Sequence, residues 1–259
     1  MSNRSILPLV ATLAMSASAL GETQSSPVAA QATSETTAPA LETTEPFSMP
    51  PSFNRTEERE PCADHDPLRR PHFGDLHVHT AWSFDASSQD TRNKPIDAYR
   101  FAMGEPMGIQ PYDENDKPTR TIQIDRPLDF TAVTDHAAFM GEVRICTTPG
   151  MEGHWHPICL VHRYAPQWTF LTLGAAGLSY KNRLGPCGEN NEHCLSKAMD
   201  TWAEIQADAE QAYDRSGECT FTSFVGYEWT AGLSTGQNLH HNVIFRNEKV
   251  PAEAKSWIE

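Results

Sequence analysis

The chain lacks the features that mark several common functional classes. It has no run rich in lysine or arginine, and its 20 Lys and Arg residues face 34 Asp and Glu residues, giving a formal charge of -14. Because nucleic-acid affinity depends on counterion release by a basic surface, we expect no nucleic-acid partner. The chain also contains no P-loop and no C-x2-C pair, the sequence signals for nucleoside triphosphate hydrolysis and for many structural zinc sites.

No apolar run is long enough to span a membrane. The longest one, from Ile6 to Met15, falls short of the roughly 20 residues that a transmembrane helix needs. It follows a short polar start with Arg4 and precedes an Ala-Ser-Ala sequence, which is the order of a secretory signal peptide. We therefore expect residues 1–19 to be a signal peptide, the mature chain to have no membrane span, and the protein to be periplasmic or secreted.

The next segment is poor in large apolar residues. Residues 20–60 are mainly Ser, Thr, Ala, Pro, Gln and Glu, so they cannot bury enough apolar area to offset the entropy of ordering. We expect a disordered linker over residues 20–60. Residues 61–259 are then predicted to form the folded, acidic part of the chain.

The six cysteines are an even number, and in an exported protein we expect them to be paired. Cys187 and Cys194 flank a polar turn that a disulfide would close locally. Cys146 and Cys159 are a candidate pair around a segment rich in Pro, Gly and His. Six cysteines allow many connectivities, so the sequence leaves the pairing open. Residues 147–193 fit neither helical nor strand periodicity and are predicted to be an insertion held by disulfides.

Apolar periodicity in the remaining chain predicts alternating strands and helices. Strands are expected over residues 73–80, 128–134, 221–229 and 242–245, and helices over 95–103 and 196–213. This order is typical of an α/β fold with a parallel sheet or barrel.

Histidines and carboxylates gather at the predicted strand ends. His77 and His79 lie two apart on one strand, so both imidazoles project from the same face and could bind one metal ion. The other candidates, each at or near a strand end or turn, are Asp85, His136, Glu228, His240 and His241. Imidazole and carboxylate ligands together suit Zn²⁺, Mn²⁺ or Fe ions better than Ca²⁺. His154 and His156 form a second His-x-His pair, but on a predicted loop between cysteines, so we expect a surface role ahead of a substrate-lid contact or metal binding. The remaining histidines, His65, His72, His162 and His193, have no such pattern and are predicted to face solvent.

Several motifs resemble those of a known superfamily. The strings are Asp75-Leu76-His77-Val78-His79-Thr80, Thr134-Asp135-His136 and Gly226-Tyr227-Glu228. They resemble the first motifs of the PHP superfamily, named for polymerase and histidinol phosphatase domains. Residues 73–79, 126–130, 225–230 and 242–246 further resemble its large, mostly secreted bacterial branch known only as a domain of unknown function. The resemblance covers roughly residues 72–247.

The resemblance implies a distorted (β/α)7 barrel whose site holds two or three divalent ions and hydrolyses phosphoesters of small molecules. The implied metal ligands are His77, His79, Asp85, His136, Glu228 and His240. His77, His79 and Glu228 would hold one ion, and Glu228 would bridge it to a second ion bound by His240. Asp85 and His136 would hold a third ion. His240 is expected rather than His241, because the resemblance places the ligand two residues before Asn242.

Asp75 and Asp135 are expected to lie next to the metal ligands without binding the metal ions themselves. They would accept hydrogen bonds that orient the ligating imidazoles. The alternative is that both aspartates cap turns at the strand ends.

The sequence also departs from the superfamily. Its members supply a later His and a late Asp-x-His pair, which have no obvious equivalent before Glu259. We therefore expect the chain to represent about the first, N-terminal half of such a barrel. An amidohydrolase-like barrel that cleaves C–N or C–O bonds is an alternative, but it predicts a metal-bridging Lys where this chain has Glu228. A second alternative is an exported metal-binding module without catalytic activity.

Overall fold

The computed structural model describes residues 59–259 apart from 67, 69, 172–176, 184, 234 and 236. The predicted signal peptide, and the predicted linker up to residue 58, lie outside the described residues. Among the residues described, no helix is long and apolar enough to cross a membrane.

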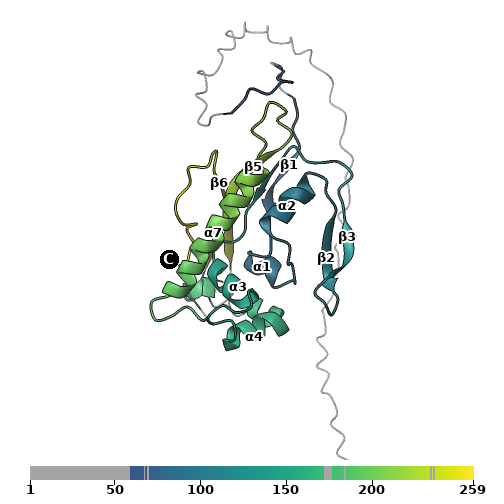
Figure 1. Ribbon diagram of the computed structural model, residues 1–259. Helices are drawn as coiled ribbons and strands as arrows, with labels where there is room; N and C mark the ends of the chain where they lie inside the picture. The colour runs from purple at the N-terminus through teal and green to yellow at the C-terminus, as the bar shows by residue number, and fades with distance from the viewer. Residues whose placement is uncertain are drawn as a thin grey trace, which may run out of the picture. The chain divides into compact units, whose positions relative to one another are not determined.

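A curled, mostly parallel sheet forms the centre of a mixed α/β fold (Figure 1). Its strands, in spatial order, are β1 (Gly74–Val78), β4 (Phe130–Val133), β5 (Thr222–Gly232) and β6 (Asn238–Ile244). The first three strands are parallel, as the sequence predicts, whereas β6 pairs antiparallel with β5. β4 and most of β5 are buried, and the two outer strands, β1 and β6, are largely exposed. The sheet is therefore a half-barrel with two outer strands that differ in direction.

Two predicted helices pack against the central strands. They are α2 (Pro95–Ala102) and α7 (Glu192–Ala212), and they contact each other as well as β4. α7 buries Trp202, Ile205 and Ala209, whose spacing of three and four residues places them on one face of the helix. α2 begins with Pro at its first turn, and the Asp97 carboxylate accepts a hydrogen bond from the Lys94 amide at 2.9 Å. Amphipathic spacing thus explains α7, and the first-turn Pro with the Asp97 contact explains where α2 begins.

A hairpin that the sequence pattern did not predict lies beside this core. It consists of β2 (Met107–Tyr112) and β3 (Pro118–Ile122), which pair antiparallel. All of β3 is exposed, so the hairpin has no alternation of apolar and polar residues to indicate a strand.

The segment between β4 and β5 is more helical than predicted. It contains α3 (Met140–Thr147), α4 (Pro157–Tyr164), α5 (Pro166–Thr169) and α6 (Leu178–Tyr180), and a further short helix, α1 (Phe84–Ser87), follows β1. α4 and α5 are short and each has a proline in its first turn, so the sequence pattern of this segment is easily taken for a loop. α3 lies so close to α7 that a Cβ on Gly141 would come within 1.9 Å of the Cys194 carbonyl oxygen.

Two disulfides hold this segment, and both match the candidate pairs. They join Cys146 to Cys159 and Cys187 to Cys194. The four sulfurs lie in a small buried cluster with Ile145, separate from the main core. The bonds therefore replace part of the apolar packing that short helices cannot supply by themselves.

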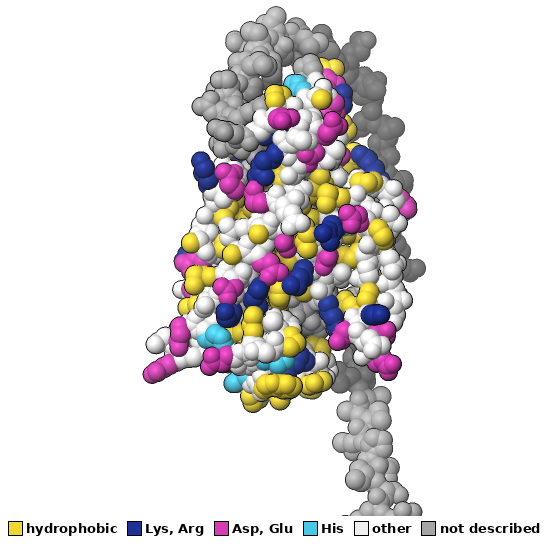
Figure 2. All heavy atoms as spheres, viewed as in Figure 1, with side chains coloured by type: hydrophobic (Ala, Val, Ile, Leu, Met, Phe, Trp, Pro, Cys, Tyr) yellow, Lys and Arg dark blue, Asp and Glu magenta, His cyan; other side chains and the backbone are white. Residues whose placement is uncertain are grey.

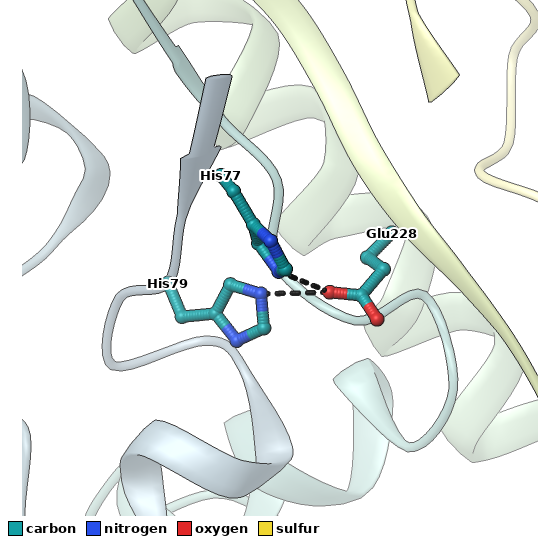
Figure 3. A group of neighbouring side chains, drawn as sticks. All are labelled: His77, His79 and Glu228. Carbon is teal, nitrogen blue, oxygen red and sulfur yellow. Dashed lines mark hydrogen bonds and ion pairs between the residues drawn. The ribbon is translucent and has the colours of Figure 1, made fainter. Parts of the chain in front are cut away.

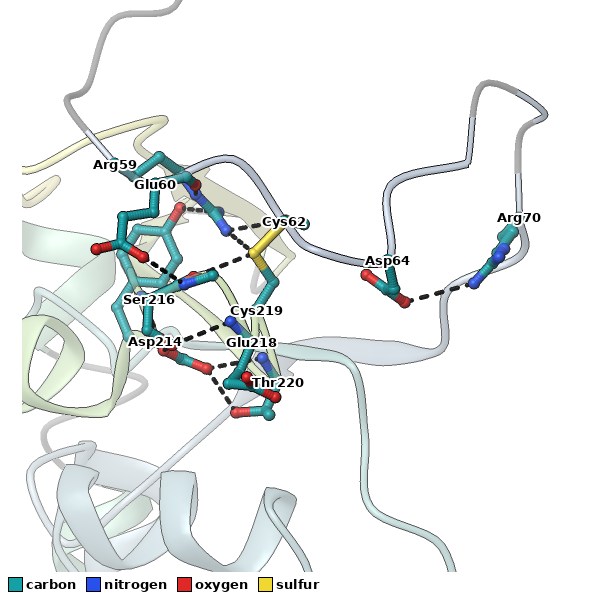
Figure 4. Close-up of a disulfide and its surroundings, with 12 residues drawn as sticks. Arg59, Glu60, Cys62, Asp64, Arg70, Asp214, Ser216, Glu218, Cys219 and Thr220 are labelled. Carbon is teal, nitrogen blue, oxygen red and sulfur yellow. Dashed lines mark hydrogen bonds and ion pairs between the residues drawn. A yellow bond between two sulfur atoms is a disulfide. The ribbon is translucent and has the colours of Figure 1, made fainter.

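The third disulfide joins Cys62 to Cys219 across 157 residues of sequence (Figure 4). It attaches the segment before β1 to the loop before β5. The Arg59 guanidinium donates to the Tyr213 hydroxyl at 3.0 Å beside it. In the same loop, Asp214 accepts hydrogen bonds from Ser216 and Thr220, which lower its pKa. The three disulfides together are typical of proteins that fold outside the cytoplasm.

The surface mixes charges of both signs. Figure 2 shows acidic and basic side chains spread over one face, with hydrophobic side chains gathered at its lower edge, where Figure 1 places α4. Exposed aromatic residues from α4 and its neighbours include Trp155 and Tyr164.

Candidate metal centre

Glu228 is the centre of a cluster of imidazoles. Its side chain is only 1% exposed, although it is a carboxylate. Oε2 lies 2.8 Å from His77 Nε2 and 2.9 Å from His79 Nε2, and both rings point toward it from the end of β1 (Figure 3). The two histidines share a face because they are two residues apart in an extended segment, as the sequence predicts.

The sheet register brings His136 to the same place. Beyond the end of β4, the Glu228 amide donates to the Asp135 carbonyl at 3.0 Å, and the Ala137 amide donates to the Glu228 carbonyl at 2.9 Å. His136 therefore lies directly beside Glu228 in a parallel bridge. Its Nδ1 is 3.6 Å from Glu228 Oε1.

The antiparallel pairing of β5 with β6 adds His240. Thr230 pairs with His240 across the strands, and Glu228 and Thr230 lie on the same face of β5 because they are two residues apart. His240 Nδ1 accordingly contacts Glu228 Oε1. The next residue, His241, lies on the opposite face of the strand, with its ring centroid 6.1 Å from that of Trp229. Of the two adjacent histidines, the structure thus brings His240 to the cluster.

Asp85 completes the cluster on the other side of His79. Both of its carboxylate oxygens lie 2.9 Å from His79 Nδ1, and Oδ2 is 3.7 Å from His136 Nε2. The Ser83 hydroxyl donates to Asp85 Oδ1 at 2.6 Å, and it also accepts a hydrogen bond from the His136 amide. Ser83, which precedes α1, was not among the predicted site residues, and it fixes the Asp85 carboxylate relative to the sheet.

The six predicted ligands form three overlapping groups that could hold metal ions. The groups are His77, His79 and Glu228; His79, Asp85 and His136; and His136, Glu228 and His240. Within each group all ligand atoms lie within 4.8 Å of one another. Glu228 belongs to two groups and has two oxygens facing different histidines, so it is placed to bridge two cations.

The donor set itself fits cations. A neutral imidazole has one N–H, yet His79 presents Nδ1 to Asp85 and Nε2 to Glu228, both at acceptor distance. Only a positive charge at this position, either a second proton or a metal ion bound by Nε2, makes both contacts favourable. Neutral imidazole nitrogens with carboxylate oxygens are the ligands that Zn²⁺, Mn²⁺ and Fe ions accept.

The charges of the cluster shift several pKa values. Burial opposes protonation of His79, but hydrogen bonds to Asp85 and Glu228 outweigh burial and raise its pKa to about 10. Burial would raise the pKa of Asp85, but its contacts with His136 and His79 lower it instead. The pKa of Glu228 is lowered in the same way, against burial, by His79 and its other imidazole neighbours. Both carboxylates are therefore anionic at neutral pH.

The two supporting aspartates contact backbone and hydroxyl groups. Asp75 accepts a hydrogen bond from the His77 amide at 2.9 Å. Asp135 is fully buried and accepts bonds from the Thr80 amide and, at 2.6 Å, from the Thr80 hydroxyl. Burial raises the pKa of Asp135 to about 6, although the bonds from Thr80 oppose this. These contacts match the alternative in which the aspartates cap the backbone near the strand end.

Two other patterns do not form a site of this kind. Glu142 lies near Cys187 and Cys194, but these cysteines form a disulfide, and both oxygens of Glu142 accept bonds from Arg183. A G-x-S-x-G pattern covers residues 232–236. It starts at the last residue of β5 and precedes β6 in the chain, and its residues 234 and 236 lie outside the described residues. The nucleophile elbow of serine hydrolases instead joins a strand to a helix.

Residues 66–258 match the family model described as "Protein of unknown function (DUF3604)". The chain belongs to the DUF3604 family. The searches of curated proteins and of solved structures found no match. All six clustered ligands of this DUF3604 chain, from His77 to His240, lie within the matched residues.

An open cleft of about 390 Å³ reaches the centre of this DUF3604 domain from solvent. Its lining residues are His77, His79, Asp85, Ala86, Gln89, Thr91 and Gln110. His77 is the most accessible of the clustered ligands, with 57% of its side chain exposed. A small molecule can therefore approach the His77 side of the cluster directly.

Proposed function

We propose that the protein is an exported metal-dependent hydrolase that cleaves phosphoesters of small molecules with a metal-activated water. The observation that carries the proposal is the position of Glu228. It is a buried carboxylate with two oxygens directed at separate sets of histidines, beside a cleft open to solvent. This arrangement suits two or three Zn²⁺, Mn²⁺ or Fe ions close together, as two-metal phosphoesterases require.

The proposal includes placement of the DUF3604 domain in the PHP superfamily. The support is the chain order of the motifs and the way the ligands that follow β1 and β4 meet Glu228 in the middle of β5. In that placement the half-barrel sheet corresponds to part of a distorted (β/α)7 barrel. Export by the predicted signal peptide agrees with the three disulfides.

The chain's own residues position the reaction. Bound divalent ions would lower the pKa of a water molecule and polarise the phosphoryl oxygen. Asp85 accepts a hydrogen bond from His79 Nδ1. Nε2 of the same ring is therefore left to face Glu228, where it could bind a metal ion. Thr230 contacts both Glu228 and His136, and its hydroxyl keeps these two side chains aligned. The exposed side of the His77 ring is where the substrate phosphate would enter.

The carboxylate at the bridging position favours this chemistry over the amidohydrolase-like alternative. An amidohydrolase-type site would have a Lys at the strand end where β5 has Glu228. A non-catalytic metal-binding module would have the same ligands, so an activity assay is needed to distinguish it from a phosphoesterase.

The test uses the full chain purified from an exporting host with its disulfides formed. Metal content would be measured by elemental analysis, and activity on phosphomonoesters, phosphodiesters, carboxylic esters and amides. We expect two or three divalent ions per chain and activity on phosphoesters. His77→Ala should lower activity by more than the roughly 10- to 100-fold typical of changes around a metal ligand. The matched control, His72→Ala, changes an exposed histidine outside the cluster and should retain activity.

Each contrary result has a distinct meaning. Stoichiometric metal with no hydrolysis of any substrate would support the non-catalytic module. Hydrolysis of amides or carboxylic esters alone would support the amidohydrolase-like alternative. Activity retained in His77→Ala would exclude this site.

A further inference from the structure

Three uncharged polar side chains line the cleft beside the candidate metal centre. Gln89 follows α1, Thr91 lies in the next loop, and Gln110 belongs to β2 of the hairpin. In the described part of the chain, the side-chain polar atoms of these three residues have no hydrogen-bond partner. Segments before and after α2 thus bring three unpartnered polar groups to one cleft.

We propose that Gln89, Thr91 and Gln110 bind the leaving group of the substrate, and that this group is uncharged and rich in hydroxyls, such as a polyol or a sugar. The proposal rests on the proposed phosphoesterase function. Hydrolysis joins the oxygen of water to phosphorus and breaks the bond from phosphorus to the leaving oxygen. A proton from the water passes to that oxygen, so the leaving group departs as a neutral alcohol.

The hydrogen-bonding capacity of the three side chains matches hydroxyl groups. Each carboxamide offers two N–H donors and a carbonyl acceptor, and the Thr91 hydroxyl both donates and accepts. A hydroxyl also donates and accepts, so adjacent hydroxyls can satisfy all three residues. A substrate with hydroxyls can replace the water on these side chains by direct hydrogen bonds, whereas an analogue without hydroxyls displaces that water without replacing its bonds. The cleft volume, about 390 Å³, lies within the range of small-molecule sites.

The charges near the cleft disfavour an anionic leaving group. Among the described residues, no Lys or Arg lines the cleft, and Asp85 contributes a negative charge. Arg92, next to Thr91 in the sequence, is paired with Asp90 and Asp116, at 2.7 Å from each. A carboxylate on the leaving group would therefore lose water without gaining a partner from the lining residues.

Arg120 is a nearby cation that could act differently. It extends from β3 and donates from Nε to the Gln110 main-chain oxygen at 2.8 Å, so its charge lies near the hairpin side of the cleft. It is not a lining residue, but the test has to separate its effect from that of Gln110.

The experiment compares four phosphomonoesters on the metal-loaded chain. Glycerol phosphate and a hexose phosphate have neutral polyhydroxylated leaving groups, phosphoglycerate carries an added carboxylate, and an aryl phosphate serves as a generic substrate. We expect kcat/KM for the polyhydroxylated substrates to exceed that for phosphoglycerate by at least about 10-fold, the lower range for loss of one good contact. Gln110→Ala should raise KM for the polyhydroxylated substrates while kcat changes little. It should leave kcat/KM for the aryl phosphate unchanged.

Matched variants sharpen the result. Thr91→Val removes one hydroxyl at nearly constant volume and should raise the same KM, whereas Thr121→Val makes the same change on exposed β3 and should not. Gln110→Lys should shift the preference toward phosphoglycerate by about 10-fold through its added charge.

The outcomes separate the two proposals. If the metal-loaded protein hydrolyses none of the phosphoesters, the proposed function fails and this inference fails with it. If it hydrolyses the aryl phosphate but does not prefer polyhydroxylated leaving groups, only the inference is overturned. A preference for phosphoglycerate that disappears in Arg120→Gln would also overturn it and assign the cleft to an anionic group bound by Arg120.

Discussion

At the residue scale, a single carboxylate organises the centre. Glu228 would be expensive to bury alone, because an unpaired charge in the interior loses its hydration. It is compensated by the imidazoles of His77, His79 and His240 and by the Thr230 hydroxyl. The same carboxylate that the resemblance marks as a bridging ligand is therefore the one that the surrounding residues are arranged to satisfy.

The adjacent histidines of β6 provide a matched pair for testing the register. His240→Ala should lower metal content by one ion per chain and reduce phosphoesterase activity at least about 10-fold, since it removes a group that contacts Glu228. His241→Ala changes the opposite face of the strand and should leave metal content and activity near those of the parent. Elemental analysis and steady-state kinetics measure both. Equal effects of the two substitutions would contradict the register that places only His240 at the cluster.

His162 is a buried histidine that the sequence pattern placed in solvent. His162 is only 5% exposed to solvent, and its Nε2 lies 3.0 Å from the hydroxyl of Ser87 in α1. Burial, and secondly the charge of Arg163, lower the pKa of His162 to about 4. The helical segment after β4 thus docks on α1 through a neutral imidazole.

This pKa predicts a window of acid sensitivity. Between about pH 6.5 and pH 4 the unfolded chain protonates His162 but the folded chain does not, so the free energy of unfolding falls as the pH falls. The contribution is complete above pH 6.5 and is bounded by about 3.5 kcal/mol, at about 1.4 kcal/mol per pKa unit. His162→Gln should flatten the pH dependence of unfolding in this window relative to the parent. The control His65→Gln, at an exposed site, should not change it.

At the element scale, disulfides replace packing where elements are short. The helices α4, α5 and α6 have at most eight residues each, too few for stable isolated helices. Two disulfides anchor the segment that contains them, and the third joins Cys62 to the loop before β5.

The three disulfides should differ in their contribution to stability according to the length of chain that they close. Cys62 and Cys219 are separated by 157 residues, Cys146 and Cys159 by 13, and Cys187 and Cys194 by 7. Paired Cys→Ala variants should lower the free energy of unfolding by about 5 kcal/mol for the first pair, about 3 kcal/mol for the second and less for the third. Denaturant unfolding of the parent and of each variant measures these differences in the free energy of unfolding. The reverse ranking would show that native-state packing rather than loop entropy dominates.

At the scale of the whole molecule, the candidate metal centre connects distant parts of the chain. Its ligands come from the end of β1, from α1, from the residues after β4, from β5 and from β6. Ions bound there would link every strand of the central sheet.

Metal removal should therefore lower global stability. Because a ligand that binds only the folded state stabilises it, chelation should lower Tm, and adding Zn²⁺ or Mn²⁺ back should restore it. A ratio of free ion to Kd of about 100 corresponds to about 3 kcal/mol. His77→Ala should reduce this difference in Tm between loaded and chelated protein, and His72→Ala should preserve it. Calorimetry with identical Tm values in chelator and in metal would contradict a metal site shared among the strands.

Much of the fold can be predicted from local sequence because local physics produces it. The strand before His79, the strand before His136 and the helix containing Trp202 each show their periodicity directly. The β2–β3 hairpin and α3 are not evident, since the exposed hairpin has no alternating pattern and α3 is buried on most of its surface. Burial of His162 is likewise invisible, because its partners belong to an element far away in the sequence.

The sequence by itself determined the types of ligand and the order in which strands deliver them. An alternating strand orients His77 and His79 together whatever surrounds it, and Glu228 is marked by its place near a strand end. Only the tertiary structure decided which of these groups meet. The antiparallel register of β6 selects His240 over His241, and the docking of α1 directs Asp85 to His79. The first depends on the register between β5 and β6 and the second on the turn that joins β1 to α1, and local periodicity encodes neither.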